Sequence, residues 1–127
     1  MEYKSFPQRE VVQDILSQIK QAITQLQDWN KDITDFSELQ CSLEGTKLLA
    51  ADCMLLEAIG EGVKRIDKYC DILTQYPQIP WKQVMSLRDR IAHGYFDIDE
   101  TIIGDVIQND LPELSNAIDF FIEILEE

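Results

Sequence analysis

Apolar side chains recur at three- and four-residue intervals along almost all of the 127 residues, and this period restricts the fold more than any other feature of the sequence. It is the repeat of an amphipathic α-helix, in which one stripe faces a core. No segment keeps the strict alternation of a β-strand over more than four residues. The sequence therefore predicts an all-α protein, an antiparallel up-and-down bundle of four to five helices in a single domain over residues 1–127.

Interruptions of the period place the helix ends. Pro77 and Pro80 form the clearest break, because each proline pushes its predecessor away from helical angles. Gly94 is the residue type that accepts the left-handed angle of a C-terminal cap, and Asp97 or Asp99 can cap the helix that follows. The expected helices cover residues 9–29, 37–69, 80–93 and 100–108, and a fifth starts at residue 110.

The long second helix carries two further signals. Asp35 and Ser37 are both suitable N-caps for it. Within it, Gly60 and Gly62 stand close together, and each costs up to about 1 kcal/mol against alanine in a helix. The two glycines mark either a bend or a point where another backbone approaches closely.

The net charge of −13 opposes binding to phosphate in bulk, yet the charges are unevenly distributed. Residues 1–63 carry 5 basic and 11 acidic side chains, residues 64–90 carry 6 and 3, and residues 91–127 carry none and 10. A solvated helix face is the plain interpretation of basic residues in the net-positive block, and nucleic-acid contact is the other. The candidate contacts in that block are Lys64, Arg65, Lys68 and Arg90.

The cysteines and the apolar segments bear on metal binding and location. Cys41, Cys53 and Cys70 lie 12 and 17 residues apart, and one histidine cannot complete a zinc site with them at a familiar spacing. No segment approaches the roughly 18 uninterrupted apolar residues that span a bilayer, and the first residues show no signal-peptide pattern. We expect a soluble, cytoplasmic protein with free thiols, no membrane partner, no metal and no cofactor.

The stretch L-R-D-R-I-A-H-G-Y at 87–95 holds the only histidine. Arg88 falls within the apolar stripe of the expected helix, where an arginine is costly unless it is paired or used. Its planar fork suits phosphate oxygens, and His93 titrates near neutral pH. Asp89 precedes His93 by four residues and shares its helix face, whereas Arg88 lies about 140° away and converges on His93 only through its length or through unwinding near Gly94. A histidine that merely caps the helix C-terminus is the alternative on these residues alone.

The R-x₄-H-x-Y pattern, present as R-D-R-I-A-H-G-Y, resembles the signature of the HEPN superfamily, and specifically of the HepT-like toxins that pair with a minimal nucleotidyltransferase antitoxin. The R-x₄-H element alone is a weak signal, but further anchors in the expected order make the resemblance specific over nearly the whole chain. These anchors are A-I-G-E-G at 58–62, Y-P-Q-I-P-W at 76–81, G-Y-F-D-I-D at 94–99 and N-D-L-P at 109–112.

The resemblance implies a helical bundle that dimerises by apposing the motif helices, with metal-independent endoribonuclease activity at the shared cleft. It assigns Arg88 and His93 as the catalytic pair, Asp89 as the polar residue beside the arginine, and Tyr95 as the tyrosine that the antitoxin adenylylates. The implied partners are RNA, the nucleotidyltransferase antitoxin and a second copy of the chain, in a homodimer or higher even oligomer. In two departures from the family pattern, many relatives have asparagine in place of Asp89 and a large aromatic residue in place of Gly104.

The chemistry of RNA cleavage agrees with a dimer. Attack by the 2′-hydroxyl of RNA needs a base for that hydroxyl, an acid for the leaving 5′-oxygen and positive charge on the phosphorane. One histidine per chain does not easily fill both proton-transfer roles, whereas a two-fold dimer brings two histidines and two arginines to one cleft. Two alternatives stay open: a nucleotide- or nucleic-acid-binding module that serves a nucleotidyltransferase without cleavage, and a structural dimerisation protein in which Arg88 pairs across the interface with Asp89.

Overall fold

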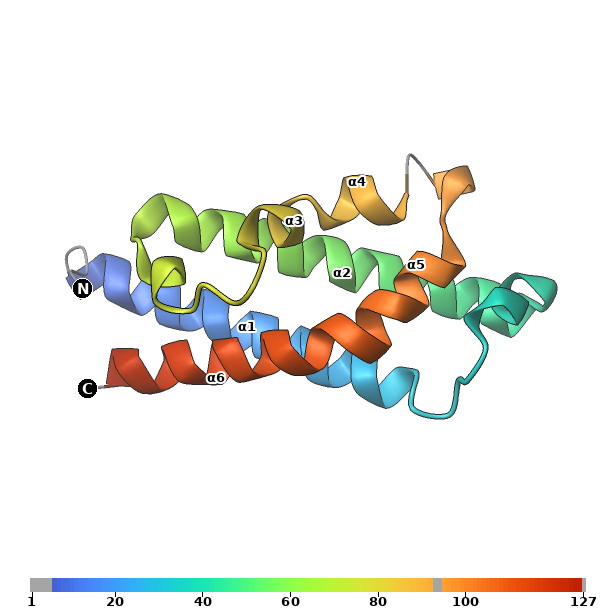
Figure 1. Ribbon diagram of the computed structural model, residues 1–127, viewed down its shortest axis with the longest axis horizontal. Coiled ribbons are helices and arrows are strands. Elements are labelled where there is room, and N and C mark those ends of the chain that lie inside the picture. Colours follow the sequence, from blue (N-terminus) through green and yellow to red (C-terminus); the bar gives the residue numbers. More distant parts are fainter. Residues whose placement is uncertain (1–5, 93–94, 127) are drawn as a thin grey trace.

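The computed structural model describes residues 6–92 and 95–126, and it is an antiparallel up-and-down bundle in which α1 starts and α6 ends at the same end (Figure 1). The helices are α1 (Phe6–Trp29), α2 (Leu43–Tyr69), α3 (Trp81–Met85), α4 (Leu87–Ile91), α5 (Glu100–Asp105) and α6 (Leu111–Glu126). They are joined by the 3₁₀ turns η1 (Phe36–Cys41), η2 (Ile72–Gln75) and η3 (Tyr95–Asp97) and by the π-turn η4 (Val106–Asp110). These described ranges contain no strand, so the predicted all-α fold is confirmed.

The core lies between α1, α2 and α6, whose apolar stripes face one another. Burying one large aliphatic or aromatic side chain contributes roughly 1.5–3 kcal/mol, so this stripe pattern supplies most of the driving force for the bundle. Side chains with essentially no exposed surface include Leu16, Ile23, Leu26, Leu56, Ile59, Ile66, Ile118 and Phe121.

The second helix begins later than the sequence predicts. Asp35 does act as a cap, but of η1, where its carboxylate accepts a hydrogen bond from the backbone N–H of Ser37. The helix α2 starts after Ser42, whose extended backbone and side-chain oxygen, accepting from the N–H of Gly45, form the N-cap. The single helix expected over 37–69 was therefore wrong at its start, because Ser42 offers its neighbours a local hydrogen bond in place of a helical one.

Gly60 lies where α2 and α3 cross. A Cβ atom at Gly60 would stand 2.7 Å from the carbonyl oxygen of Val84, closer than real contacts allow. The predicted close approach of another backbone is confirmed here, and α2 continues through Gly62 to Tyr69 without interruption. This crossing sets the distance between α2 and the two helices α3 and α4.

The expected third helix is two short helices, α3 and α4, which meet at Ser86. The backbone angles of Ser86, φ −107° and ψ 22°, depart from the helical range. Its N–H donates to the carbonyl oxygen of Gln83, three residues back, which is the tighter 3₁₀ pattern. The prediction of one continuous helix over 80–93 was wrong, because this tight turn redirects the chain before the motif begins.

Helix α4, which carries Arg88 and is called the motif helix below, also ends earlier than predicted. Helix α4 stops at Ile91, since Ala92 has the extended angles φ −160° and ψ 142°. The carbonyl oxygen of Ile91 accepts the N–H of Asp99 at 2.8 Å, so it is not available to a further helical turn. Ala92 then pairs with Ile98 in an isolated antiparallel bridge. The cap predicted at Gly94 lies outside the described residues.

The two C-terminal helices form one continuous helical path. Asp99 caps α5 as predicted, accepting the N–H groups of Thr101 and Ile102. The path then passes through η4, where the N–H of Leu111 donates to the carbonyl oxygen of Val106, five residues back. The expected break between these helices was wrong, because the wider π-turn accommodates a proline at 112 whose ring would meet the carbonyl four residues earlier in a regular α-helix.

Candidate active site

Arg88 stands at a surface pocket of about 270 Å³ between α2 and α4. Its side chain is 68% exposed, and its Nη1 lies 3.7 Å from Oε1 of Glu57 on α2. The desolvation cost expected for an arginine in an apolar stripe does not arise, because α4 buries Leu87 and Ile91 and leaves Arg88 exposed. The pocket is lined by Ala50, Cys53, Met54, Glu57, Arg88, Ala92 and Ile98.

Glu57 is the site residue that the sequence reasoning missed. Helix α2 runs antiparallel to α3 and α4, and it crosses α3 at Gly60 and Val84. In an antiparallel pair, one turn before the crossing on the first helix faces one turn after it on the second. Glu57 and Arg88 stand about one turn from that crossing on their respective helices. Predicting this ion pair would have required Val84 as the residue that crosses Gly60, and the sequence does not indicate that residue.

Cys53 is the one thiol in this pocket. Burial raises its pKa, and the negative charge of Glu57 raises it further, although Arg88 acts in the opposite direction. A thiol with a raised pKa is protonated at neutral pH and is a weak nucleophile. The pocket therefore offers a cation for phosphate and apolar walls, and no activated cysteine.

His93 and the side chain of Tyr95 lie outside the described residues, so their predicted roles stay predictions. Helix α4 ends at Ile91, and the predicted relation between Asp89 and His93 lies outside the described residues. The chain leaves the helix at Ala92, two residues before Gly94, where the sequence predicted unwinding. Unwinding of the helix was one of the two ways in which Arg88 was expected to approach His93.

Two described residues on either side of the end of the motif meet beside Arg88. Ala92, which lines the Arg88 pocket, pairs with Ile98 of the same pocket wall. Asp89 is exposed on α4, next to the arginine in sequence.

The side of α2 that faces away from the core continues the site along the helix, and we call it the outer face of α2. By helical geometry it comprises Leu43, Lys47, Ala50, Met54, Glu57, Glu61, Lys64, Arg65 and Lys68. Its N-terminal half is apolar except at Lys47, and its C-terminal half is charged, with three predicted RNA contacts there. Lys64, Arg65 and Lys68 are exposed, and they begin about 10 Å beyond Glu57 at a rise of about 1.5 Å per residue.

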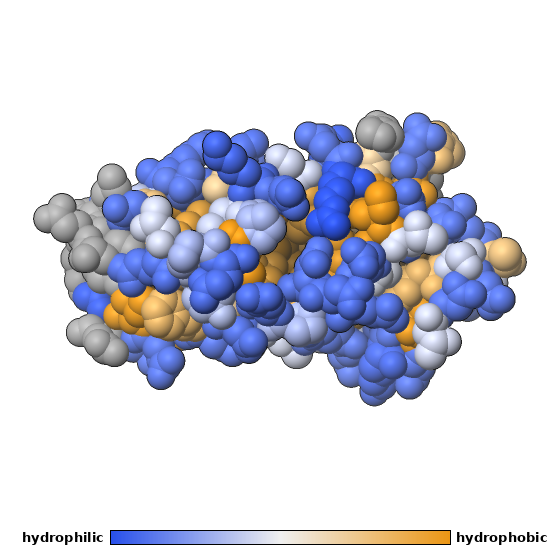
Figure 2. Space-filling view, in the orientation of Figure 1, coloured by the Kyte–Doolittle hydropathy of each residue, from blue (hydrophilic) through white to orange (hydrophobic). Residues whose placement is uncertain are grey.

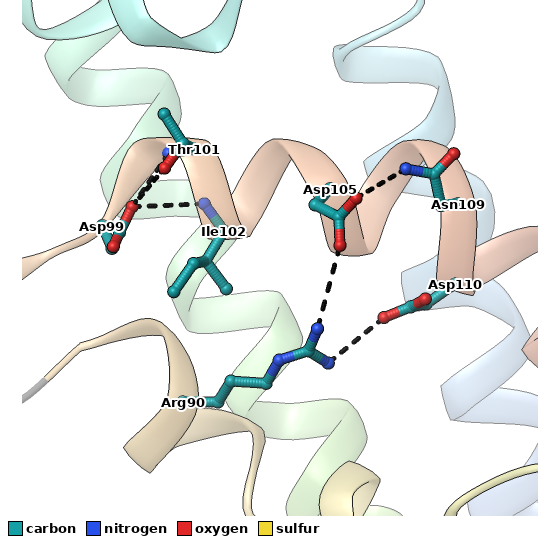
Figure 3. A network of polar contacts seen from close by, with 7 residues as sticks. All are labelled: Arg90, Asp99, Thr101, Ile102, Asp105, Asn109 and Asp110. Atoms are coloured by element: carbon teal, nitrogen blue, oxygen red, sulfur yellow. Dashed lines mark hydrogen bonds and ion pairs between the residues drawn. The ribbon is translucent and has the colours of Figure 1, made fainter.

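Arg90, the fourth predicted RNA contact, lies apart from this group. It reaches from α4 toward η4, where its Nη1 stands 3.2 Å from Oδ2 of Asp110 and its Nη2 stands 3.8 Å from Oδ2 of Asp105 (Figure 3). Asp105 also accepts a hydrogen bond from the side chain of Asn109. The structure thus brings three of the predicted basic residues to the Arg88 side of the molecule and engages the fourth elsewhere.

Residues 6–92 and 95–126 contain no group of three histidine, cysteine, aspartate or glutamate side chains arranged to hold a metal ion. Among the helices that these residues form, none combines the length and the apolar character required to cross a membrane.

Comparison with known protein families places this chain in one of them. A family model described as "Ribonuclease HepT-like" matches residues 19–120, a span that contains α4 and the whole Arg88 pocket. The chain belongs to the HepT-like family. This confirms the family resemblance drawn from the motif and its flanking anchors.

Individual HepT-like relatives extend over most of the chain. Two proteins of Methanocaldococcus jannaschii, each named "Putative RNase", are 36% and 32% identical to it; the matches cover 93% and 95% of this chain and 89% and 98% of theirs. A protein of Thermococcus cleftensis named "Probable ribonuclease HepT" is 31% identical over 80% of this chain and 86% of its own. No solved structure matches the chain.

The departure at Gly104 from the HepT-like pattern has a structural explanation. A Cβ atom on Gly104 would lie 2.5 Å from ring atoms of Phe36, so the ring packs directly on the glycine backbone. An aromatic side chain therefore fills this position of the bundle, but it comes from η1 instead of α5. The substitution concerns packing beside α5, away from the Arg88 pocket.

Proposed function

We propose that this HepT-like protein is a metal-independent endoribonuclease that cleaves RNA at a cleft shared by two copies. The observation that carries the proposal is the exposed Arg88 in its pocket, within a ribonuclease HepT-like chain. Its contact with Glu57, at 3.7 Å, is longer than a hydrogen bond, so the guanidinium can turn its donors to a phosphate. There it stabilises the charge that develops on the phosphorane.

The proposed reaction is an internal transfer. The 2′-oxygen of RNA attacks the adjacent phosphorus while His93 of one copy takes the proton of the 2′-hydroxyl. The bond from phosphorus to the 5′-oxygen breaks, and His93 of the second copy gives that oxygen a proton. The products carry a 2′,3′-cyclic phosphate and a 5′-hydroxyl. Because each chain has one histidine, both proton transfers at once require two chains.

The N-terminal half of the outer face of α2, apolar except at Lys47, supports a homodimer. Met54 is 67% exposed beside the Arg88 pocket, and Phe96, which lines the adjoining hollow with Ala50, is 93% exposed. Burying such side chains is worth roughly 1.5–3 kcal/mol each, and two-fold symmetry doubles every contact. Met54→Glu and Phe96→Glu should each shift the protein to a monomer in sedimentation at micromolar concentration, and a wild-type monomer would exclude the shared cleft.

The charged half of the same face supports an RNA path. Arg88, Lys64, Arg65 and Lys68 lie along one side of the molecule, where we propose that the RNA backbone passes from the cleft over the C-terminal half of α2. Each lysine that contacts a phosphate should contribute about one unit to the salt dependence of binding.

We further propose that the protein is the toxin of a toxin–antitoxin pair, neutralised by a nucleotidyltransferase that modifies Tyr95. The phenolic oxygen of Tyr95 attacks the α-phosphorus of ATP, and pyrophosphate leaves. The adenylyl phosphate adds negative charge and bulk beside the Arg88 pocket, which repels and occludes RNA phosphate. The backbone of Tyr95 starts η3, directly after the segment that begins beside Arg88, which favours this placement.

The test incubates purified protein with total RNA in EDTA and maps the ends of the products. Wild type should cleave and leave cyclic phosphate and 5′-hydroxyl ends, and Arg88→Ala and His93→Ala should abolish cleavage while the helical circular dichroism is retained. The matched control is Lys31→Ala. Lys31 lies in the turn after α1, where it forms an exposed ion pair with Asp28, and the change removes one positive charge.

Three results would redirect the proposal. RNA binding without cleavage by wild type would indicate a nucleic-acid-binding module, and a dimer that neither binds nor cleaves RNA would indicate a structural role. Products with 5′-phosphates would point to a water nucleophile and a metal.

A further inference from the structure

Arg90 is the third residue of the motif R-D-R, and its surroundings assign it a role different from that of Arg88. We propose that Arg90 is a positioning residue that fixes helix α4, and with it Arg88, through a double ion pair that the π-turn η4 creates. The catalytic part of this inference rests on the proposed ribonuclease function, whereas its structural part does not.

Helix α4 needs such a support because it is short and isolated along the chain. It has five residues, and both flanking positions, Ser86 and Ala92, leave the helical range. Two side chains, Leu87 and Ile91, bury it in the core. Two buried side chains one turn apart fix the position of a short helix. They restrict its rotation about the line that joins them less strongly.

Packing between α4 and the C-terminal helical path is interrupted by a hollow on the side that faces α6. A hollow of about 170 Å³ separates α3 and α4 from η4 and the start of α6, and Figure 2 shows apolar surface exposed within this depression. Its walls include Val84, Leu87, Val106 and Leu111, and Arg90 and Asp110 lie at its edge. Across this hollow the ion pairs of Arg90 join α4 to Asp105 and Asp110.

The π-turn is what gives Arg90 two partners. Asp105 and Asp110 are five residues apart, which would place them about 140° apart around a regular α-helix. In η4 the hydrogen bond runs over five residues, so side chains with that separation come to the same side. Figure 3 shows the result: both carboxylates point to one guanidinium, at 3.2 Å for Asp110 and 3.8 Å for Asp105.

The support acts directly on the catalytic arginine. Arg88 and Arg90 are two residues apart and therefore project from nearly opposite sides of α4. When Arg90 is held toward η4, Arg88 is directed toward α2 and the pocket at Glu57. The hydrogen bond from the N–H of Asp99 to the carbonyl oxygen of Ile91 attaches the start of α5 to the end of α4, so α5 is joined to the motif helix near both of its ends.

The two roles for Arg90 predict opposite effects of removing its carboxylate partners. If Arg90 positions α4, Asp105→Asn combined with Asp110→Asn should reproduce the defect of Arg90→Ala. If Arg90 instead contacts RNA, the same double change releases its charge and should tighten RNA binding.

The experiment measures RNA cleavage for Arg90→Ala, Arg90→Lys and the double asparagine variant, with Lys31→Ala as the control. A misplacement of about 1 Å costs on the order of a hundred-fold, so kcat should fall about ten- to a hundred-fold in Arg90→Ala and in the double variant. KM and the salt dependence should stay within about two-fold of wild type. Arg90→Lys, which keeps the charge but loses the fork, should fall between, and adding Arg90→Ala to the double variant should cause no further loss.

Amide hydrogen exchange tests the same inference without reference to catalysis. The amides of Ala92 and Asp99, which bond to Arg88 and Ile91, should exchange about ten-fold faster in the Arg90→Ala and double variants, while amides of α1 stay unchanged. Unchanged exchange at both amides would overturn the positioning role, as would a raised KM with a salt slope reduced by about one. If wild type cleaves no RNA, the proposed function fails, and the exchange measurement still decides the inference. If Arg90→Ala does not fold, Arg90→Lys and the double variant supply both measurements.

Discussion

Replacing the buried Asp52 should stabilise the protein. Asp52 lies on α2 with no exposed surface, and its Oδ1 accepts a hydrogen bond of 2.8 Å from Nδ2 of Asn30. Among the described residues, the other carboxylate oxygen and Oδ1 of Asn30 have no hydrogen-bond partner. Burial raises the pKa of Asp52 from 3.8 to about 6, and the hydrogen bond from Asn30 offsets part of this effect.

The magnitude follows from that pKa. Each unit of pKa corresponds to about 1.4 kcal/mol, so an ionised Asp52 costs the folded state about 3 kcal/mol at pH 7. Asp52→Asn removes the charge, and the new amide nitrogen can donate to Oδ1 of Asn30. The two atoms that lack a partner in wild type would then be bonded to each other. We expect the free energy of unfolding at pH 7 to rise by about 1–3 kcal/mol in urea titrations, whereas Glu61→Gln, an exposed change on the same helix, should alter it little.

The pH dependence gives the sharper test. Between pH 3.8 and about 6 the folded state binds a proton at Asp52 that the unfolded state releases, so wild-type stability should rise as the pH falls through this window. From pH 7 to pH 5 the contribution of this group is about 1 kcal/mol, and Asp52→Asn should lack it. A variant that is less stable than wild type at pH 7, or a stability difference that is constant from pH 4 to pH 7, would refute the reasoning.

Four further outcomes are expected. Gly60→Ala should lower the free energy of unfolding by about 1–2 kcal/mol, because overpacking against the carbonyl of Val84 exceeds the gain in helix propensity; a shifted urea midpoint with unchanged slope would show it. RNA cleavage should persist in EDTA, and its loss would indicate a metal. Lys68→Ala should raise KM and reduce the salt slope by about one while kcat is retained. Tyr95→Phe should cleave RNA yet show no added mass by mass spectrometry after co-expression with the nucleotidyltransferase, and an inhibited, unmodified wild type would exclude that route.

The features that the sequence predicted correctly are those fixed by local patterns. Apolar stripes gave the bundle, and Asp99 caps α5 because a carboxylate before a helical run can bond only the first free N–H groups. The close approach at Gly60 was predictable because glycine inside a long helix needs a packing reason.

The errors arise where a distant residue decides the local structure. Nothing between residues 87 and 95 indicates that the carbonyl oxygen of Ile91 is bonded by Asp99, which ends α4. The π-turn is equally hidden, since hydrogen bonds over four and five residues are both compatible with the same short stretch of side chains. The pairing of Arg88 with Glu57 required the helix crossing as well as the motif.

The packing of Phe36 on Gly104 has a consequence for how this family diverges. The two positions share one volume, so an aromatic residue at 104 and one at 36 exclude each other. A lineage that exchanges the large side chain from one element to the other passes through an intermediate with either two rings or none, and both intermediates are destabilised. The two positions should therefore covary across aligned relatives, large with small, and a chimera that joins the N-terminal half of one subgroup to the C-terminal half of the other should fold poorly unless both positions are exchanged together.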